Sequence, residues 1–132
     1  MNYLLDTDTC IHFLNRNPTI ISKITALSAD DLAISCFNIT ELLYGAYNST
    51  QIANNLARVH FIEDTIKVLN FDRESMENYA VIKSELKKQG KLIDDFDILI
   101  AAVTISNQLI LVTCNEKHFE RIPNLKIENW LS

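Results

Sequence analysis

Glycine and proline are scarce in this sequence, with two of each in 132 residues. No glycine-rich loop of the kind that cradles phosphates is present, so nucleotide binding of the P-loop or dinucleotide type is not expected. No linker, internal repeat or low-complexity segment interrupts the chain. A chain of this length usually forms one domain with a substantial core. We therefore predict a single domain over residues 1–132.

Long apolar runs and paired cysteines are also missing. The longest uninterrupted apolar run, Ile98 to Val103, is far too short to cross a bilayer. The first residues lack the basic and apolar regions of a signal peptide. Cys10, Cys36 and Cys114 are odd in number, far apart and without zinc-site spacing, which favours buried, reduced thiols. These features predict a cytoplasmic protein with no membrane segment.

Basic residues are fewer than acidic ones, 12 against 17, and the net charge is −5. This balance argues against a protein that binds nucleic acid through a broad basic face. It is compatible with nucleic acid held locally by a few Lys and Arg side chains around an acidic metal site.

Short apolar runs alternate with segments of helical periodicity along the whole chain. Four runs predict strands, at Tyr3–Leu5, Leu32–Ser35, Lys67–Phe71 and Leu109–Thr113, and Lys126–Glu128 predicts a short edge strand covered by Trp130. Apolar periodicity predicts helices that include Ile20–Leu27, Ile39–Tyr47, Ile52–Ile62, Met76–Gln89 and Phe96–Ser106. This alternation indicates an α/β fold with a mainly parallel sheet of four to five strands.

Acidic side chains stand where the predicted strands and helices meet. Asp6 and Glu41 follow the first two strands, and Asp97 begins the helix that leads to the fourth. One interpretation is local: Asn38 or Asp94 would cap a helix, and the acid three residues later would complete a capping box. Asp6 or Thr7 would likewise cap the first helix.

The local interpretation does not account for the convergence of these acids. In a parallel sheet the positions just after the strands share one edge, together with Thr113 and Asn115. Clustered carboxylates raise one another's pKa values unless a cation neutralises them. A hard divalent cation with oxygen ligands meets that need, and it can activate water against a phosphodiester.

Four motifs, taken in order, resemble those of PIN-domain proteins, and most closely the VapC-type toxins of bacterial toxin–antitoxin pairs. They are Leu4-Leu5-Asp6-Thr7-Asp8, Ile39-Thr40-Glu41-Leu42 with Tyr44-Gly45, Phe96-Asp97-Ile98-Leu99-Ile100-Ala101-Ala102, and Leu111-Val112-Thr113-Cys114-Asn115 with Phe119. The resemblance implies a three-layer α/β/α sandwich and a Mg²⁺- or Mn²⁺-dependent endoribonuclease. It further implies an RNA substrate such as tRNA, a homodimer, and a hetero-oligomer with a cognate antitoxin that neutralises it.

Geometry and resemblance together suggest residue roles. The resemblance places the catalytic acids at Asp6, Glu41 and Asp97, with Asp6 and Asp97 as direct metal ligands. Glu41 would bind the metal through water or orient the attacking water. Thr7, Thr113 and Asn115 would complete the hydrogen-bonded shell, although many PIN domains have a fourth acid where this chain has Asn115. The candidates for RNA backbone contact are Lys87, Lys88 and Lys91, followed by Lys117 and Arg121.

Two other functions remain open at this point. Asp6-Thr7-Asp8 also looks like the nucleophile and acid pair of haloacid-dehalogenase-like phosphohydrolases, in which Asp6 would form an aspartyl-phosphate. A PIN-like scaffold that only binds a partner or RNA would be favoured by the loss of one of the three acids, and none is missing. The lysine run at 87–91 also suits an ordinary solvated helix end.

Overall fold

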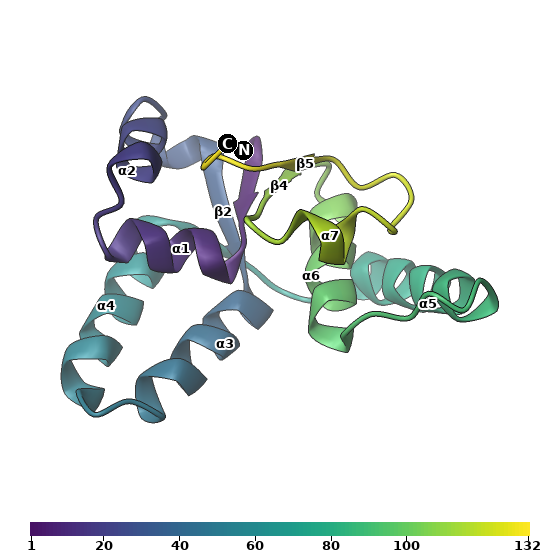
Figure 1. The fold of residues 1–132 in the computed structure, drawn as a ribbon, viewed down its shortest axis with the longest axis horizontal. Coiled ribbons are helices and arrows are strands. Elements are labelled where there is room, and N and C mark those ends of the chain that lie inside the picture. Colours follow the sequence, from purple (N-terminus) through teal and green to yellow (C-terminus); the bar gives the residue numbers. More distant parts are fainter.

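A computed structural model describes residues 1–132, which form a five-stranded sheet covered by helices on both faces (Figure 1). The strands are β1 (Tyr3–Leu5), β2 (Leu32–Ser35), β3 (Lys67–Leu69), β4 (Ile110–Val112) and β5 (Ile127–Glu128). Their order in the sheet is β3-β2-β1-β4-β5, and every neighbouring pair is parallel. The predicted α/β class and mainly parallel sheet are therefore confirmed.

Helices form each connection between the strands. They are α1 (Thr7–Leu14), α2 (Pro18–Thr25), α3 (Cys36–Tyr47), α4 (Ile52–Thr65), α5 (Arg73–Lys88), α6 (Asp95–Ser106) and α7 (Glu116–Phe119), with a short 3₁₀ turn, η1, at Ala29–Asp31. None of these helices combines the length and the apolar character needed to span a membrane. The chain builds β1, β2 and β3 outward in one direction and then crosses to β4 on the other side of β1. The direction reverses between β1 and β4, which makes that edge the switch point where α/β proteins bind ligands.

Strict alternation along the strands divides the core into two halves. Leu4 and Leu111 contribute to one apolar cluster, which includes residues of α5, α6 and α7. Leu5 and Val112 contribute to the other, which includes residues of α1, α2, α3 and α4. Successive strand residues point to opposite faces, and here both sets are apolar. Both faces of the sheet must therefore be covered. The three-layer architecture follows from this requirement.

Helix caps set several boundaries differently from the periodicity. Ser35, the last residue of β2, caps α3, so the helix begins directly at Cys36. Asn38 is therefore the third helical residue, and the prediction that it is the N-cap is wrong. Asp94 does cap α6, accepting a hydrogen bond from the Phe96 N–H at 2.8 Å. The short helix α7 was not predicted because four residues are too few to show a helical period.

The C-terminal edge strand forms as predicted. β5 pairs with β4, and the buried Trp130 ring packs edge-on against Tyr3 with 5.2 Å between centroids. The Trp130 indole N–H donates to Glu128 at 3.1 Å. The last residues of the chain are thus held against its first strand, and the two termini lie close together in Figure 1.

Truncation of a core residue of α6 should destabilise the whole chain. Ile100 is 1% exposed, and Ile100→Ala is expected to lower the free energy of unfolding by about 2–5 kcal/mol because it leaves a cavity. The control is Val81→Ala on α5, where the side chain is 58% exposed and the change should stay within about 0.5 kcal/mol. Urea denaturation measures both. Equal losses for the two variants would contradict the assignment of α6 to the core.

Candidate active site

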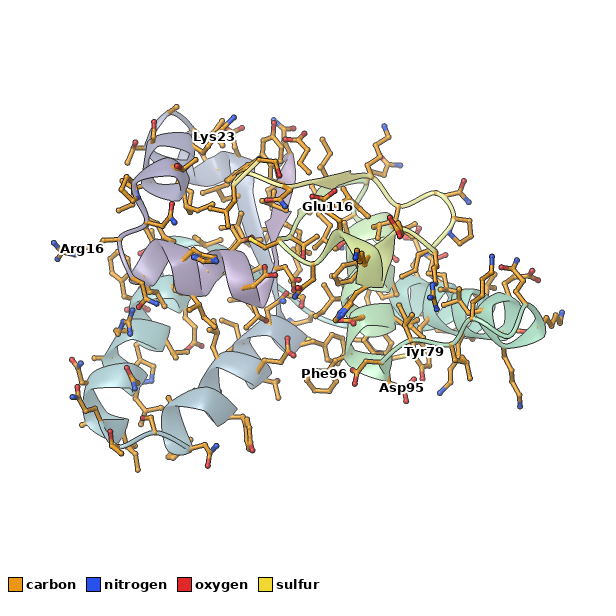
Figure 2. The ribbon with its side chains drawn as sticks, in the orientation of Figure 1. Arg16, Lys23, Tyr79, Asp95, Phe96 and Glu116 are labelled. Carbon is orange, nitrogen blue, oxygen red and sulfur yellow. The ribbon has the colours of Figure 1, made fainter.

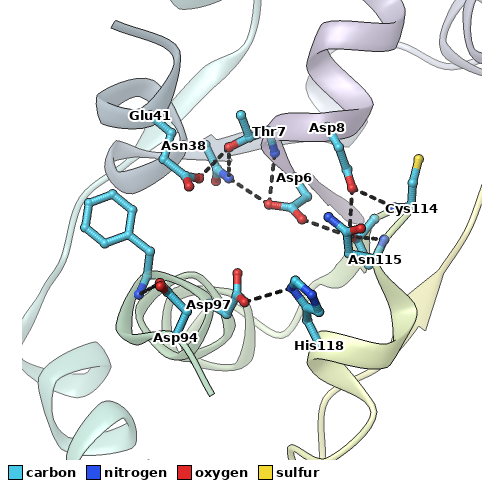
Figure 3. A network of polar contacts seen from close by, with 12 residues as sticks. Asp6, Thr7, Asp8, Asn38, Glu41, Asp94, Asp97, Cys114, Asn115 and His118 are labelled. Atoms are coloured by element: carbon cyan, nitrogen blue, oxygen red, sulfur yellow. Dashed lines mark hydrogen bonds and ion pairs between the residues drawn. The ribbon is translucent and has the colours of Figure 1, made fainter. Parts of the chain in front are cut away.

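Asp6 stands at the carboxyl end of the central strand, beside the end of β4. Its backbone N–H donates to the Val112 carbonyl at 2.9 Å, which continues the pairing of the two strands. The buried carboxylate accepts three hydrogen bonds, from the Thr7 N–H (2.9 Å), the Asn38 side-chain amide (3.1 Å) and the Thr113 hydroxyl (2.8 Å). Figure 3 shows these donors converging on Asp6 from different segments. Asp6 also caps α1, which confirms the local interpretation, and the same carboxylate contacts side chains of α3 and of the residue after β4.

The cap of α3 determines how Asn38 reaches Asp6. The Asn38 side-chain oxygen accepts from the Ser35 N–H at 3.1 Å and the Ser35 hydroxyl at 2.6 Å. This arrangement turns the amide nitrogen towards the site, where it donates to Asp6 and to the Thr7 hydroxyl, each at 3.1 Å. Asn38 is completely buried and is a site residue that the sequence analysis did not identify. Its position three residues before Glu41, on the same helix face, is the signal that was available.

Glu41 lies one turn further along α3 and is connected to Asp6 through Thr7. The Thr7 hydroxyl donates to the Glu41 carboxylate at 2.6 Å and accepts from Asn38. Thr7 is thus part of the predicted hydrogen-bonded shell. The prediction that Glu41 completes a capping box is wrong, because Ser35 and Asn38 form that box.

Asp97 enters the site from the first turn of α6. Its side chain is 19% exposed, and its carboxylate lies 3.2 Å from Nδ1 of His118 on α7. It makes no hydrogen bond back to the cap at Asp94, so the capping-box role predicted for it is wrong. His118 was not included among the predicted site residues, because only the tertiary fold brings α7 against the start of α6.

Burial, with repulsion from nearby carboxylates, raises the pKa values of all three acids. Burial, with the nearby charges of Asp8 and Glu41, raises the pKa of Asp6 from 3.8 to about 7, against the opposing hydrogen bonds from Thr113 and Thr7. Burial is also the largest cause of the raised pKa of Glu41, with Asp97 adding to it, and of the raised pKa of Asp97. None of the three forms an ion pair with a Lys or Arg.

The three carboxylates face one open space and do not converge on a single point (Figure 3). No group of three His, Cys, Asp or Glu side chains is close enough together to form a complete metal-ligand set. The atoms that this site offers to a metal ion are oxygens, and no thiol is among them. Cys10 is buried, whereas Cys36 and Cys114 are only half-buried, so the prediction of three buried cysteines is wrong for two of them.

The remaining acids and polar residues take different positions. Asn115 contributes its backbone N–H, which donates to the Thr113 hydroxyl at 3.0 Å, and its side chain makes no hydrogen bond. Asp8 accepts from the Cys114 N–H at 3.1 Å, beside the site. Asp95 points away from it, pairing with Lys83 at 2.8 Å and with the Tyr79 hydroxyl at 3.0 Å (Figure 2).

The basic residues proposed from the sequence divide into two groups. Lys117 and Arg121 line a pocket together with Asp97 and His118, directly beside the acids. Lys87 and Lys88 end α5, and Lys91 follows just after; this end of the helix lies far from the start of α6 in Figure 1. Only the first group is therefore brought to the site.

The fold and the site define the class: an α/β protein with acids gathered at the switch point of a parallel sheet. Comparison with known proteins identifies the family. The PIN domain family matches residues 3–125. Ribonuclease VapC2 of Haemophilus influenzae is 36% identical over 131 residues, covering 99% of both chains. The tRNA(fMet)-specific endonuclease VapC of Salmonella typhimurium is 34% identical, covering 98% of both. Among solved structures, the DNA-bound VapBC of Salmonella typhimurium superimposes with a TM-score of 0.92 at 34% identity, covering 98% of each chain. This chain belongs to the PIN-domain family, in its VapC ribonuclease group.

The raised pKa of Asp6 predicts a pH dependence of stability in the metal-free protein. The folded protein binds this proton more tightly than the unfolded chain does. The resulting stabilisation is complete below the ordinary pKa of 3.8 and is lost as the pH rises through about 7. In EDTA, the wild type should lose on the order of a few kcal/mol over this range, and Asp6→Asn should show a flatter curve. Chemical denaturation at a series of pH values measures the slope. Identical slopes would show that Asp6 does not titrate in this window.

Proposed function

We propose that this protein is a divalent-metal-dependent endoribonuclease toxin that an antitoxin partner neutralises. The observation that carries the proposal is the meeting of Asp6, Glu41 and Asp97 in one space without a Lys or Arg to neutralise them. Relatives of this chain are named as ribonucleases, and carboxylates that can hold a cation suit the hydrolysis of a phosphodiester.

The donor set fits a hydrated Mg²⁺ or Mn²⁺ ion. Mg²⁺ usually takes one or two carboxylates and keeps several waters, so it does not require a closed set of protein ligands. Asp6 and Asp97 would hold the ion, and Glu41 would bind it through water. The raised pKa values of these three groups support this assignment, because a cation in their midst would favour the ionised forms that burial and nearby carboxylates disfavour.

Each residue would have a distinct part in hydrolysis. When bound, the ion would supply positive charge that lowers the pKa of a water and stabilises the charge developing on the phosphate. Glu41, oriented by the Thr7 hydroxyl at 2.6 Å, would accept the proton of the attacking water. Thr113 and Asn38 would keep the Asp6 carboxylate in one orientation through their two hydrogen bonds to it.

The partner and substrate follow from the relatives. One relative is named a tRNA(fMet)-specific endonuclease, and a structure similar to this chain is that of a VapBC complex. We infer an RNA substrate, with tRNA as the first candidate, and a cognate antitoxin as partner. The homodimer and the cytoplasmic location implied earlier stay predictions.

The two alternative functions lose their support. Membership of the PIN-domain family replaces the haloacid-dehalogenase-like interpretation of Asp6-Thr7-Asp8. Asp6 is also a poor candidate nucleophile, because both of its oxygens accept hydrogen bonds. The non-catalytic scaffold is disfavoured because all three acids are present and face one another.

Loss of one acid should abolish cleavage and leave the fold intact. Asp97→Asn keeps the size of the side chain, and we expect RNA cleavage to fall by at least about a hundredfold, because residues that act as a unit fail together. Asp95→Asn is the matched control, because Asp95 lies two residues away and points outward to Lys83. Cleavage by the wild type should stop in EDTA and return with Mg²⁺ or Mn²⁺. Full activity in excess EDTA would refute the metal-dependent mechanism.

Lys117 and Arg121 should contact the RNA backbone next to the cleaved bond. Neither forms an ion pair in the structure, and both border the pocket at Asp97. In the Asp97→Asn background, Lys117→Ala with Arg121→Ala should weaken RNA binding and reduce the salt slope by about 1.4, since each phosphate contact in a single strand contributes about 0.7.

The control for this pair is Lys87→Ala with Lys88→Ala, which removes the same charge at the far end of α5. Its salt slope should match that of the Asp97→Asn parent. Fluorescence anisotropy at several salt concentrations measures both variants, and equal losses would assign the effect to net charge alone.

A further inference from the structure

A second pocket adjoins Glu41 and shares Asp94 with the pocket of Lys117 and Arg121. Its volume is about 640 Å³, within the range of roughly 300–1,000 Å³ that is usual for ligand pockets. Thr7 and Glu41 line it, so it borders the Glu41 carboxylate of the site. The full lining consists of Thr7, Thr40, Glu41, Tyr44, Asp94 and Phe96.

Two aromatic rings form the apolar part of this pocket. Tyr44 on α3 is 70% exposed. Phe96 projects from the first turn of α6 (Figure 2). Its ring is held by an edge-to-face contact with Phe37 at 5.9 Å, and Phe37 in turn packs against Phe71 at 5.2 Å. Phe96 is therefore held by aromatic packing, whereas the exposed Tyr44 ring has no such aromatic contact.

The charges around the pocket determine which part of a nucleotide it suits. Glu41 and Asp94 line it and no Lys or Arg does, so a phosphate would be repelled there. The carboxylates instead suit the amino and imino N–H donors of a base edge. The cations stand at the other pocket, beyond Asp97. Asp94 borders both pockets, so an RNA strand whose scissile phosphate lies at the acids can place a neighbouring nucleotide in each of them.

We propose that the pocket between Tyr44 and Phe96 binds an unpaired nucleobase of the RNA substrate, next to the cleaved bond. This inference rests on the proposed ribonuclease function and extends it. The base stacks between or against the two rings, while the backbone crosses the carboxylates towards Lys117 and Arg121. A base that is paired within an RNA helix cannot stack on an aromatic side chain. The enzyme therefore cuts where nucleotides are unpaired.

The test compares Tyr44→Leu with Tyr47→Leu in RNA cleavage. Tyr47 is on the same helix, is 64% exposed and does not line the pocket, so it is a matched control. The probe is a short single-stranded RNA that the wild type cleaves. Tyr44→Leu should lower kcat/KM by about 10- to 100-fold, the usual loss for one stacked base. Tyr44→Phe and Tyr44→Trp should retain activity because they keep the ring.

A substrate that lacks the base completes a double-mutant cycle with Tyr44→Leu. An abasic nucleotide next to the cleaved bond should slow the wild type by a similar factor and should have little further effect on Tyr44→Leu, since the two changes remove one contact. Pyrrolocytosine at that nucleotide should be quenched on binding to Asp97→Asn, and less so once Tyr44→Leu is added.

The possible outcomes separate the two proposals. If the wild type cleaves no RNA, the proposed function fails. If it cleaves but Tyr44→Leu behaves like Tyr47→Leu, or loses equally on intact and abasic strands, only the base pocket is refuted. If Tyr44→Leu weakens binding of a protein partner and leaves cleavage unchanged, the pocket receives a protein side chain and this inference is overturned.

Discussion

The buried carboxylate of Asp6 is the constraint on which the rest of the site depends. It cannot be left unpaired at the end of the central strand, because a buried polar group without partners costs free energy. Its three donors come from three places: the start of α1, the first turn of α3, and the residue after β4. Satisfying this one group therefore fixes how those segments meet at the switch point of the sheet.

Neutral donors, and not cations, perform this role, and this choice bears on function. A Lys or Arg in place of Asn38 would neutralise Asp6 and remove the need for an ion. Amide and hydroxyl donors orient the carboxylates without neutralising them, and burial, with nearby carboxylates, keeps the pKa values of Asp6, Glu41 and Asp97 raised. The site is thus left without a basic partner and is open to a divalent cation. Positive charge is kept to one side, at Lys117 and Arg121.

Periodicity and turn chemistry predicted much of the fold. Alternation of strand-like and helix-like segments indicated the parallel sheet, and Asp6, Glu41 and Asp97 stand where the strand ends suggested. The errors were local. Asn38 was assigned as a cap because Asn is a good N-cap residue, but Ser35 occupies that position and leaves Asn38 to reach Asp6. Helix α7 has too few residues to show a period, so the sequence does not predict the contact of His118 with Asp97.

The sequence by itself determined which faces must be buried, where strands end in acids, and therefore the class of fold. These properties are carried by residues close together in the chain, through the periods of 2 and 3.6. Only the tertiary structure decided which polar groups touch. Asp6 and Thr113 are 107 residues apart, and Asp97 and His118 are 21 apart. The difference between Lys117 near the acids and Lys87 far from them likewise depends on how α5 and α7 pack. No local pattern encodes such contacts, because they arise from the crossing of the chain over the sheet.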